Sequence, residues 1–306
     1  MAATSDCSHA SVAPLFSPAR SGWEDKLLRC VVCGLGFLSP APAPEEIQRF
    51  YPDDYYSFHE LCDVPRPFDL RAVCIRGAFG SPRLVDRIAH RLFRGRFGGD
   101  TRIERVGKIL DVGCGDGYVL SALREIGWDV SGVELSRAAA KRGVERGLNI
   151  IAGDLVGAGF RPESFDVIRM SHVLEHCPCP AREIAEAYRL LRLGGRIIVA
   201  VPNLASWAAR LFKRDWSALD LPRHLYHFMP SNLLPLLTAA GFRPLHVFSY
   251  SVGTAFSSLA WVRQARGSRG AGRTIVTLGL KGACVAFDCI ANLAGRGDCF
   301  EIQAVK

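Results

Sequence analysis

The sequence predicts an α/β fold built on a Rossmann-like, doubly wound and mostly parallel sheet. Three observations lead to this prediction. Hydrophobic residues make up 49% of the 306-residue chain and charged residues 22%, so a sizeable core can be buried. Between residues 108 and 201, short apolar runs alternate with helical patterns of roughly 10–15 residues, a rhythm typical of βαβ units. A glycine-rich turn follows the first of these runs.

The apolar runs and the segments between them set the expected order of elements. The runs predict strands at residues 109–112, 128–133, 149–152, 165–170 and 196–201. The segments between them predict helices at 118–126, 136–146 and 181–193. Because each helix connects two strands, the sheet is expected to carry helices on both faces.

Composition divides the chain into four predicted segments. Residues 1–44 are loop-like, 45–105 are helical and basic, 106–250 contain the strand–helix alternation, and 251–306 form a helical insertion and a final edge strand. Within the second segment, residues 82–93 carry apolar residues at helical spacing, with Ser81 as a candidate N-cap.

The formal net charge of +8 is concentrated in one part of the sequence. From Arg66 to Lys108, eleven basic residues face four acidic ones, a local net charge of +7. A uniformly basic nucleic-acid binder is therefore disfavoured. The eleven cysteines, without a recognisable secretory leader, predict free thiols in a reducing cytoplasm, and no apolar run is long enough to predict a membrane-spanning helix.

The most informative segment is the turn in residues 109–117 (ILDVGCGDG). Its spacing is G-x-G-x-G, which differs from the G-x-G-x-x-G that places a pyrophosphate on a helix N-terminus. Glu134 ends the next predicted strand, where a carboxylate can accept hydrogen bonds from both hydroxyls of a ribose. Turn and carboxylate together predict a nucleoside site.

This segment resembles motif I of the class I S-adenosylmethionine-dependent methyltransferases, and residues 132–136 resemble their second-strand acidic motif. Segments 153–155, 171–176 and 193–195 match further family positions in order, so the resemblance covers about residues 105–250. It implies S-adenosylmethionine as cofactor, and an antiparallel edge pair formed by residues 242–248 and 299–305. The cofactor-binding positions that it implies are Asp111, Gly113, Cys114, Gly115, Gly117, Glu134, Leu135, Asp154, Leu155, Ser171 and His172.

Two histidine-containing segments are candidates for the acceptor side. Residues 172–176 match the H-x-x-E-H pattern of some zinc peptidases, but Pro178 and Pro180 interrupt the helix that such a site needs. The segment lies where the family has its substrate loop, so His176 is a candidate base. The alternative is that the residues of this segment only pack the loop and cap the next helix. Residues 220–228 resemble an acceptor-pocket segment of the small-molecule branch, which makes His224 a candidate base or acceptor ligand rather than a structural histidine.

The same resemblance leaves the need for a metal open. Some relatives bind a divalent cation through Glu-x-x-Glu-His and a distant His, and this chain has His172 in place of the first Glu. Separately, Cys30 and Cys33 form half of a zinc ribbon, in a segment that resembles the N-terminal module of a bacterial methyltransferase subgroup. Cys7 and His9 can complete a structural zinc site of three cysteines and one histidine; the alternative is a relic ribbon that folds without metal.

The predicted function is methyl transfer to a small-molecule acceptor, a hydroxyl of a sugar or glycan, a polyketide or a quinone-like compound, either free or attached to a lipid or carrier. Two alternatives stay open: a methyltransferase-like binding or scaffold protein without turnover, and an NAD-dependent oxidoreductase. For the insertion after residue 250 we favour a packing helix pair over a pocket lid or a membrane-surface contact beside the arginine-rich helix. The sequence leaves the oligomeric state unknown.

Overall fold

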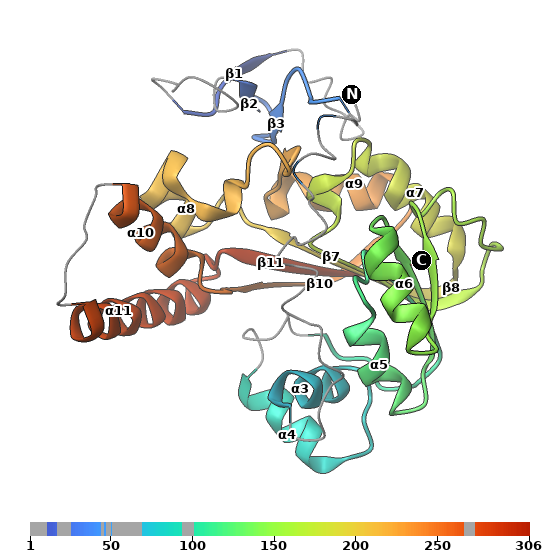
Figure 1. The fold of residues 1–306 in the computed structure, drawn as a ribbon. Coiled ribbons are helices and arrows are strands. Elements are labelled where there is room, and N and C mark those ends of the chain that lie inside the picture. The colour runs from blue at the N-terminus through green and yellow to red at the C-terminus, as the bar shows by residue number, and fades with distance from the viewer. Residues whose placement is uncertain are drawn as a thin grey trace.

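A computed structural model describes residues 11–16, 26–43, 46, 50, 69–93, 101–265 and 273–306. Its centre is a seven-stranded sheet (Figure 1). From one edge to the other the strands are β10 (Arg243–Tyr250), β11 (Cys299–Val305), β8 (Leu191–Pro202), β7 (Phe165–Ser171), β4 (Lys108–Val112), β5 (Asp129–Glu134) and β6 (Asn149–Ala152). The strands from β8 to β6 are parallel, and β11 runs antiparallel to both of its neighbours. This confirms the predicted fold class.

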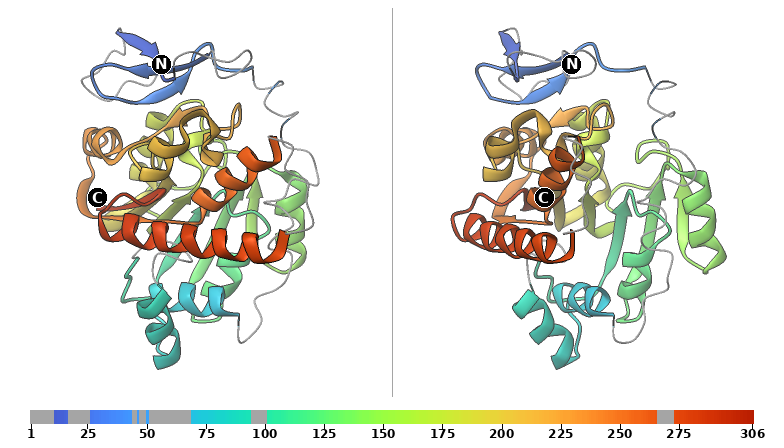
Figure 2. Two further views of the ribbon diagram at one scale, coloured as in Figure 1. Left: turned by 90° about the vertical axis from the view of Figure 1, so that its left-hand side faces the viewer. Right: turned by 60° about the vertical axis from the view of Figure 1, so that its left-hand side comes forward.

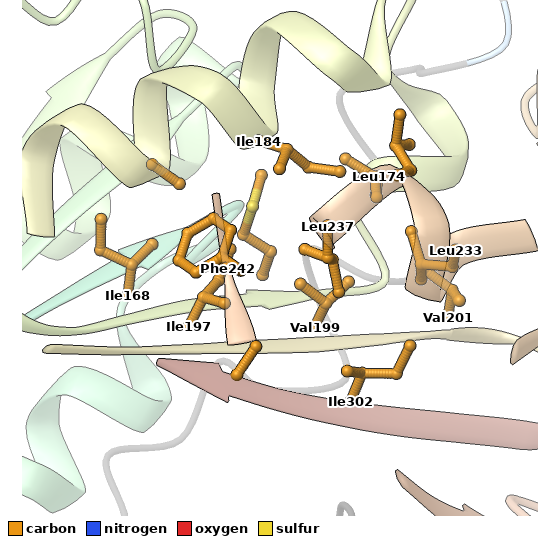
Figure 3. Packing of buried hydrophobic residues seen from close by; sticks show 14 of the residues in the cluster. Ile168, Leu174, Ile184, Ile197, Val199, Val201, Leu233, Leu237, Phe242 and Ile302 are labelled. Carbon is orange, nitrogen blue, oxygen red and sulfur yellow. The ribbon is translucent and has the colours of Figure 1, made fainter. Parts of the chain in front are cut away.

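Helices cover both faces of this sheet because successive strand residues point to opposite sides. On β8, Ile197 and Val199 lie in one buried cluster and Ile198 lies in another. The first cluster is covered by α7 (Pro180–Leu190) and α9 (Pro230–Ala239), and Figure 3 shows Ile184 and Leu237 reaching down onto this face. The second is covered by α3 (Leu70–Ala78) and α5 (Tyr118–Arg124), and α6 (Arg137–Glu145) follows β5.

The basic segment supplies α3 and α4 (Leu84–Phe93); α3 packs against both α4 and α5 (Figure 1). Asp69 caps α3 and accepts a hydrogen bond from the hydroxyl of Tyr118, the first residue of α5. Arg76, near the end of α3, contacts the carboxylates of Asp86 at 3.1 Å and Glu125 at 2.9 Å. Since both ends of α3 contact α5, this helix begins beside the glycine-rich turn.

The N-terminal strands form a second, smaller sheet with a short strand from the middle of the chain. Its order is β1 (Val12–Pro14), β2 (Leu27–Cys30), β3 (Gly36–Leu38) and β9 (Tyr226–His227). Gly36 and Phe37 pair with β9, and Cys30 lies in the same buried cluster as Phe228. The N-terminal sheet therefore supports the segment that carries His224.

The C-terminal region adds helices on the side of β10. They are α8 (Trp207–Phe212), α10 (Thr254–Ala265) and the long α11 (Arg273–Leu293), which stands out in Figure 2. Short 3-10 helices, η3 (Lys213–Asp215) and η4 (Ser217–Leu219), connect α8 to the histidine segment. No helix among the described residues is long and apolar enough to cross a membrane.

Two local expectations need correction. The final strand β11 lies between β8 and β10, and β10 forms the edge. The reason is that nearly all of β11 is buried, a pattern that requires neighbours on both sides. The helix expected to reach residue 193 ends at Leu190, because Leu191 begins β8 and Gly194 turns the chain with a φ of +77°.

Candidate active site

The glycine-rich turn leaves the carboxyl end of β4 and leads directly into α5. Gly113, Gly115 and Gly117 all have positive φ, at +68°, +58° and +84°. A side chain at Gly117 would overlap with Leu148, and one at Gly113 would overlap with Val173. A Cβ added to Gly115 meets no atom within 4 Å, so space lies open above this residue. The turn is thus fixed on two sides and exposed on the third, as a ligand cradle requires.

Glu134 lies at the end of β5 and faces this turn. Its carboxylate accepts hydrogen bonds from the backbone amides of Gly115 and Ser136, both at 2.8 Å. Burial raises the pKa of the Glu134 carboxyl, and the two amides act against that increase. Each carboxylate oxygen keeps a further lone pair for an incoming hydroxyl.

Two residues of the motif have roles inside the sheet. Asp111 is buried and forms an ion pair with Arg169 of β7 at 2.8 Å. Burial raises the pKa of the Asp111 carboxyl, and the charge of Arg169 lowers it. The thiol of Cys114 is also buried, which raises its pKa far above the usual range, and it lies where a Cβ on Gly132 would be. Cys114 therefore packs the turn against β5.

The remaining predicted cofactor residues differ in their exposure to solvent. Leu135 is 74% exposed directly after Glu134, an apolar surface at the rim. Asp154 is exposed, and its carboxylate accepts a hydrogen bond from the backbone amide of Gly157 at 2.6 Å. Leu155 is buried in the main core.

The loop after β7 approaches the turn from the other side. Ser171 ends β7, and His172 adopts a left-handed conformation with a φ of +56°. A short 3-10 helix, η2 (Leu174–His176), follows. The carboxylate of Glu175 is 1% exposed and forms no hydrogen bond among the described residues; its Oε1 lies 3.3 Å from Nδ1 of His172.

The structure brings His176 and His224 together although 48 positions separate them in the sequence. Their ring centroids are 4.6 Å apart. Nδ1 of His176 lies 3.1 Å from the carbonyl of Arg223, and Nδ1 of His224 lies 2.9 Å from the carbonyl of Ala218. Burial, followed by the neighbouring His176, lowers the pKa of His224 well below its usual value, so this ring is neutral. With its Nδ1 proton donated to Ala218, His224 keeps a lone pair on Nε2.

Glu175, His176 and His224 each offer a ligand atom, and these atoms lie within 4.8 Å of one another. A buried carboxylate that forms no hydrogen bond within the described part of the chain, next to two imidazoles, is a donor set that suits a divalent transition-metal ion. His172, at the position of the first Glu of the metal-binding relatives, contacts the same carboxylate.

The predicted zinc site lies partly outside the described residues, since Cys7 and His9 are not among them. Cys30 is buried at the end of β2, and Cys33 is half-buried in the turn that follows. A structural zinc at this point stays a prediction.

Sequence reasoning missed a cavity between α3, α4 and the sheet. His90 and Phe93 of α4 line this cavity. Four polar residues of the strands line it as well: Arg169, Ser171, Tyr250 and Glu301. Glu301 accepts hydrogen bonds from Thr101 and Gln303, both at 2.9 Å. The available signal was the pair of polar residues at 301 and 303, two apart in an otherwise apolar strand.

A comparison with known families agrees with this fold. A family model described as a methyltransferase domain matches residues 80–247, more than half of the chain. The chain belongs to the methyltransferase domain family. The match includes the glycine-rich turn, Glu134 and both histidine segments.

Curated relatives agree with the family. Two proteins named ubiquinone biosynthesis O-methyltransferase, from Idiomarina loihiensis and Thiobacillus denitrificans, are 30% and 34% identical to this chain. Each alignment covers 46% of this chain, and the aligned parts are 63% and 67% of the respective relatives. The chain thus spans about two thirds of their length.

Among solved structures, SpnF, described as a (4+2) cyclase, covers 87% of this chain and 97% of its own length with a TM-score of 0.50 and 21% identity. This likeness shows the fold alone. Since one protein with this fold is described as a cyclase, the fold by itself does not define the reaction.

The cofactor that the family implies is S-adenosylmethionine, and the residues present fit it. The open space above Gly115 admits the ligand close to the backbone, the Glu134 carboxylate faces the same space, and Leu135 presents an apolar surface beside it. These features suit the amino-acid part, the ribose and the adenine of S-adenosylmethionine.

Proposed function

We propose that this protein transfers the methyl group of S-adenosylmethionine to a hydroxyl oxygen of a small, quinone-like acceptor such as a catechol or a hydroquinone. The names of the curated relatives support the acceptor class. The observation that carries the proposal is the cluster of Glu175, half-buried His176 and His224 beside the loop that contacts the glycine-rich turn.

The chemistry needs alignment and the removal of one proton. S-adenosylmethionine supplies a methyl group that is already activated as a sulfonium. The protein holds the acceptor oxygen in line with it, and the acceptor proton passes to Nε2 of His224. The hydrogen bond from Nδ1 to Ala218 leaves Nε2 as the atom that accepts the proton, while burial, which lowers the pKa of His224, opposes its protonation. General-base assistance of this kind accelerates a reaction by about 10²–10⁴-fold.

A second arrangement is favoured by the carboxylate of Glu175, which forms no hydrogen bond among the described residues. If Glu175, His176 and His224 hold a divalent cation, it supplies Lewis acidity that favours ionisation of the acceptor hydroxyl. His224 is then a ligand and not the base. Dialysis against EDTA and readdition of Mg²⁺, Mn²⁺ or Zn²⁺ separates the two: activity that survives EDTA supports the base, and activity that returns only with a metal supports the cation.

The decisive experiment is a methyl-transfer screen with purified protein, S-adenosylmethionine and catechol or hydroquinone acceptors, read by mass spectrometry. We expect a monomethylated product that the His224→Gln variant does not form. A parallel panel of sugars and polyketide phenols tests the other acceptor classes. Calorimetry completes the design: S-adenosylmethionine binding without product in any panel favours the binding-protein alternative, and preference for NAD favours an oxidoreductase.

A further inference from the structure

Helix α4 directs part of its apolar surface away from the molecule. Leu84, Ile88 and Leu92 follow one another at four-residue intervals, and Val85 lies next to them on the same face. These four side chains are between 49% and 72% exposed. The buried residues of α4 are Asp86, Ala89 and His90; they face α3, and Ala89 borders the exposed face, one turn after Val85.

Arginines line one border of this apolar face. Arg83, Arg87 and Arg91 each precede one of the exposed residues 84, 88 and 92 by one position, so they form a parallel row. All three are exposed, and none forms an ion pair with a carboxylate of the described residues. The one acidic residue of the helix, Asp86, is buried and contacts Arg76. The outer surface of α4 is therefore apolar on one side and positively charged on the other.

This combination is the one that an anionic phospholipid surface accepts. An amphipathic helix lies in the plane of such a surface with its apolar residues at the boundary between headgroups and acyl chains, while its basic residues meet the lipid phosphates. Figures 1 and 2 show α4 at one end of the molecule, on the outer side of α3, where no other drawn element covers it. We propose that α4 docks this protein on an anionic membrane surface.

The charge row distinguishes this occupant from a second copy of the chain. In a two-fold symmetric contact between antiparallel α4 helices, the axis crosses the helices and places the two arginine rows on the same side of the contact. The cores of protein interfaces are also depleted of charged residues. Lipid phosphates carry the negative charge that pairs with the arginine row, whereas a second α4 helix does not.

The same helix connects this surface to the interior. His90 and Phe93 line the cavity that also contains Ser171, at the carboxyl end of β7. Docking through α4 therefore places that cavity next to the lipid surface. The docking itself follows from α4 alone and does not depend on which acceptor the enzyme uses.

The test is cosedimentation of the full-length protein with vesicles of phosphatidylcholine alone or of phosphatidylcholine mixed with phosphatidylglycerol. We expect binding to the anionic vesicles that weakens with added salt. The double variant Leu84→Gln/Leu92→Gln is expected to bind roughly tenfold or more weakly, because two exposed leucines no longer enter the lipid. Arg87→Glu is expected to bind at least about fivefold more weakly, since each basic residue near the surface contributes about this factor.

Matched controls lie elsewhere on the surface. Leu193→Gln removes a leucine that is 86% exposed at the start of β8, and Arg161→Glu reverses an exposed arginine in a loop. Both should bind vesicles like the unaltered protein, and all variants should keep its circular dichroism spectrum. Equal binding to both vesicle types, or equal losses in variants and controls, would overturn the proposal. So would a dimer, seen by sedimentation without lipid, that Leu84→Gln/Leu92→Gln converts to a monomer.

Discussion

The two sides of the candidate site are built in different ways. The cofactor side consists of consecutive motifs: the glycine-rich turn after β4 and Glu134 at the end of the neighbouring β5. Its geometry depends on backbone conformations and backbone amides. The acceptor side combines η2 with the segment around His224, two regions far apart in the sequence. Its geometry depends on packing by β9 and the N-terminal sheet.

This difference teaches where mutations should act. A contiguous turn needs particular residues at particular positions, so changes on the cofactor side should alter the binding of S-adenosylmethionine. The acceptor side is held by contacts between distant segments and carries the ionisable groups, so changes there should alter turnover while the cofactor still binds.

The largest effect is expected on the acceptor side. His224→Gln should lower kcat by about 10²–10⁴-fold, because it removes the group that accepts the proton or holds the cation. Its affinity for S-adenosylmethionine, measured by calorimetry, should not change. If His224→Gln also lost affinity for S-adenosylmethionine, the cofactor side and the acceptor side would not act independently, which contradicts this prediction.

The next effect belongs to the cofactor side. Glu134→Gln should weaken S-adenosylmethionine binding by roughly 10–100-fold, since charge-assisted hydrogen bonds to the ribose contribute about 1.5–3 kcal/mol. The amide keeps an oxygen for one of the two backbone donors, so the variant should remain folded. At saturating cofactor, kcat should stay within a few-fold of the unaltered enzyme; a large drop in kcat would mean that Glu134 also positions the methyl group.

Two glycines sharpen the comparison within the turn. In both Gly115→Ala and Gly117→Ala a left-handed residue gains a side chain, at a cost of roughly 1–2 kcal/mol of stability. Gly117→Ala also forces overlap with Leu148, whereas Gly115→Ala points into open space. In thermal unfolding, Gly117→Ala should therefore lose more stability than Gly115→Ala. Cofactor affinity should fall in Gly115→Ala, and an unchanged affinity there would show that the ligand lies elsewhere.

The sequence predicted the strands on the cofactor side well because their determinants are local. The strand expected at residues 109–112 is β4 (Lys108–Val112), and Glu134 lies at the end of β5 as expected. Such elements follow from short apolar runs and from glycines with few substitutes. By contrast, the contact between His176 and His224 depends on the chain folding back over a long distance, which periodicity cannot show.

Helix α4 illustrates the same limit. Its apolar spacing predicted a helix correctly, within two residues at the N-terminus. The spacing predicts which side of a helix is apolar, but it does not predict whether that side packs against the hydrophobic core. Here part of it faces outward, because α3 covers only the neighbouring strip that contains Ala89.

The smallest expected effect is on the pH dependence of folding stability, to which the two sides contribute with opposite sign. Burial lowers the pKa of His227, beside His224, to about 4, so the folded protein binds fewer protons there than the unfolded chain. Its contribution to stability is present above the unfolded pKa of about 6.5 and is lost as the pH falls towards 4, at up to about 1.4 kcal/mol per pH unit. Glu134 has the opposite sign: its raised pKa makes the folded state bind more protons, which favours folding as the pH falls.

Denaturant unfolding between pH 7 and pH 4.5, in EDTA, measures this contrast. His227→Gln should reduce the loss of stability on acidification, and Glu134→Gln should increase it, because each variant removes one of the two opposing groups. If His227→Gln left the slope of stability against pH unchanged, the ring would have the same pKa in the folded and in the unfolded protein. In that case burial would not control the charge of the histidines, and the neutral state assigned to His224 would lose its physical basis.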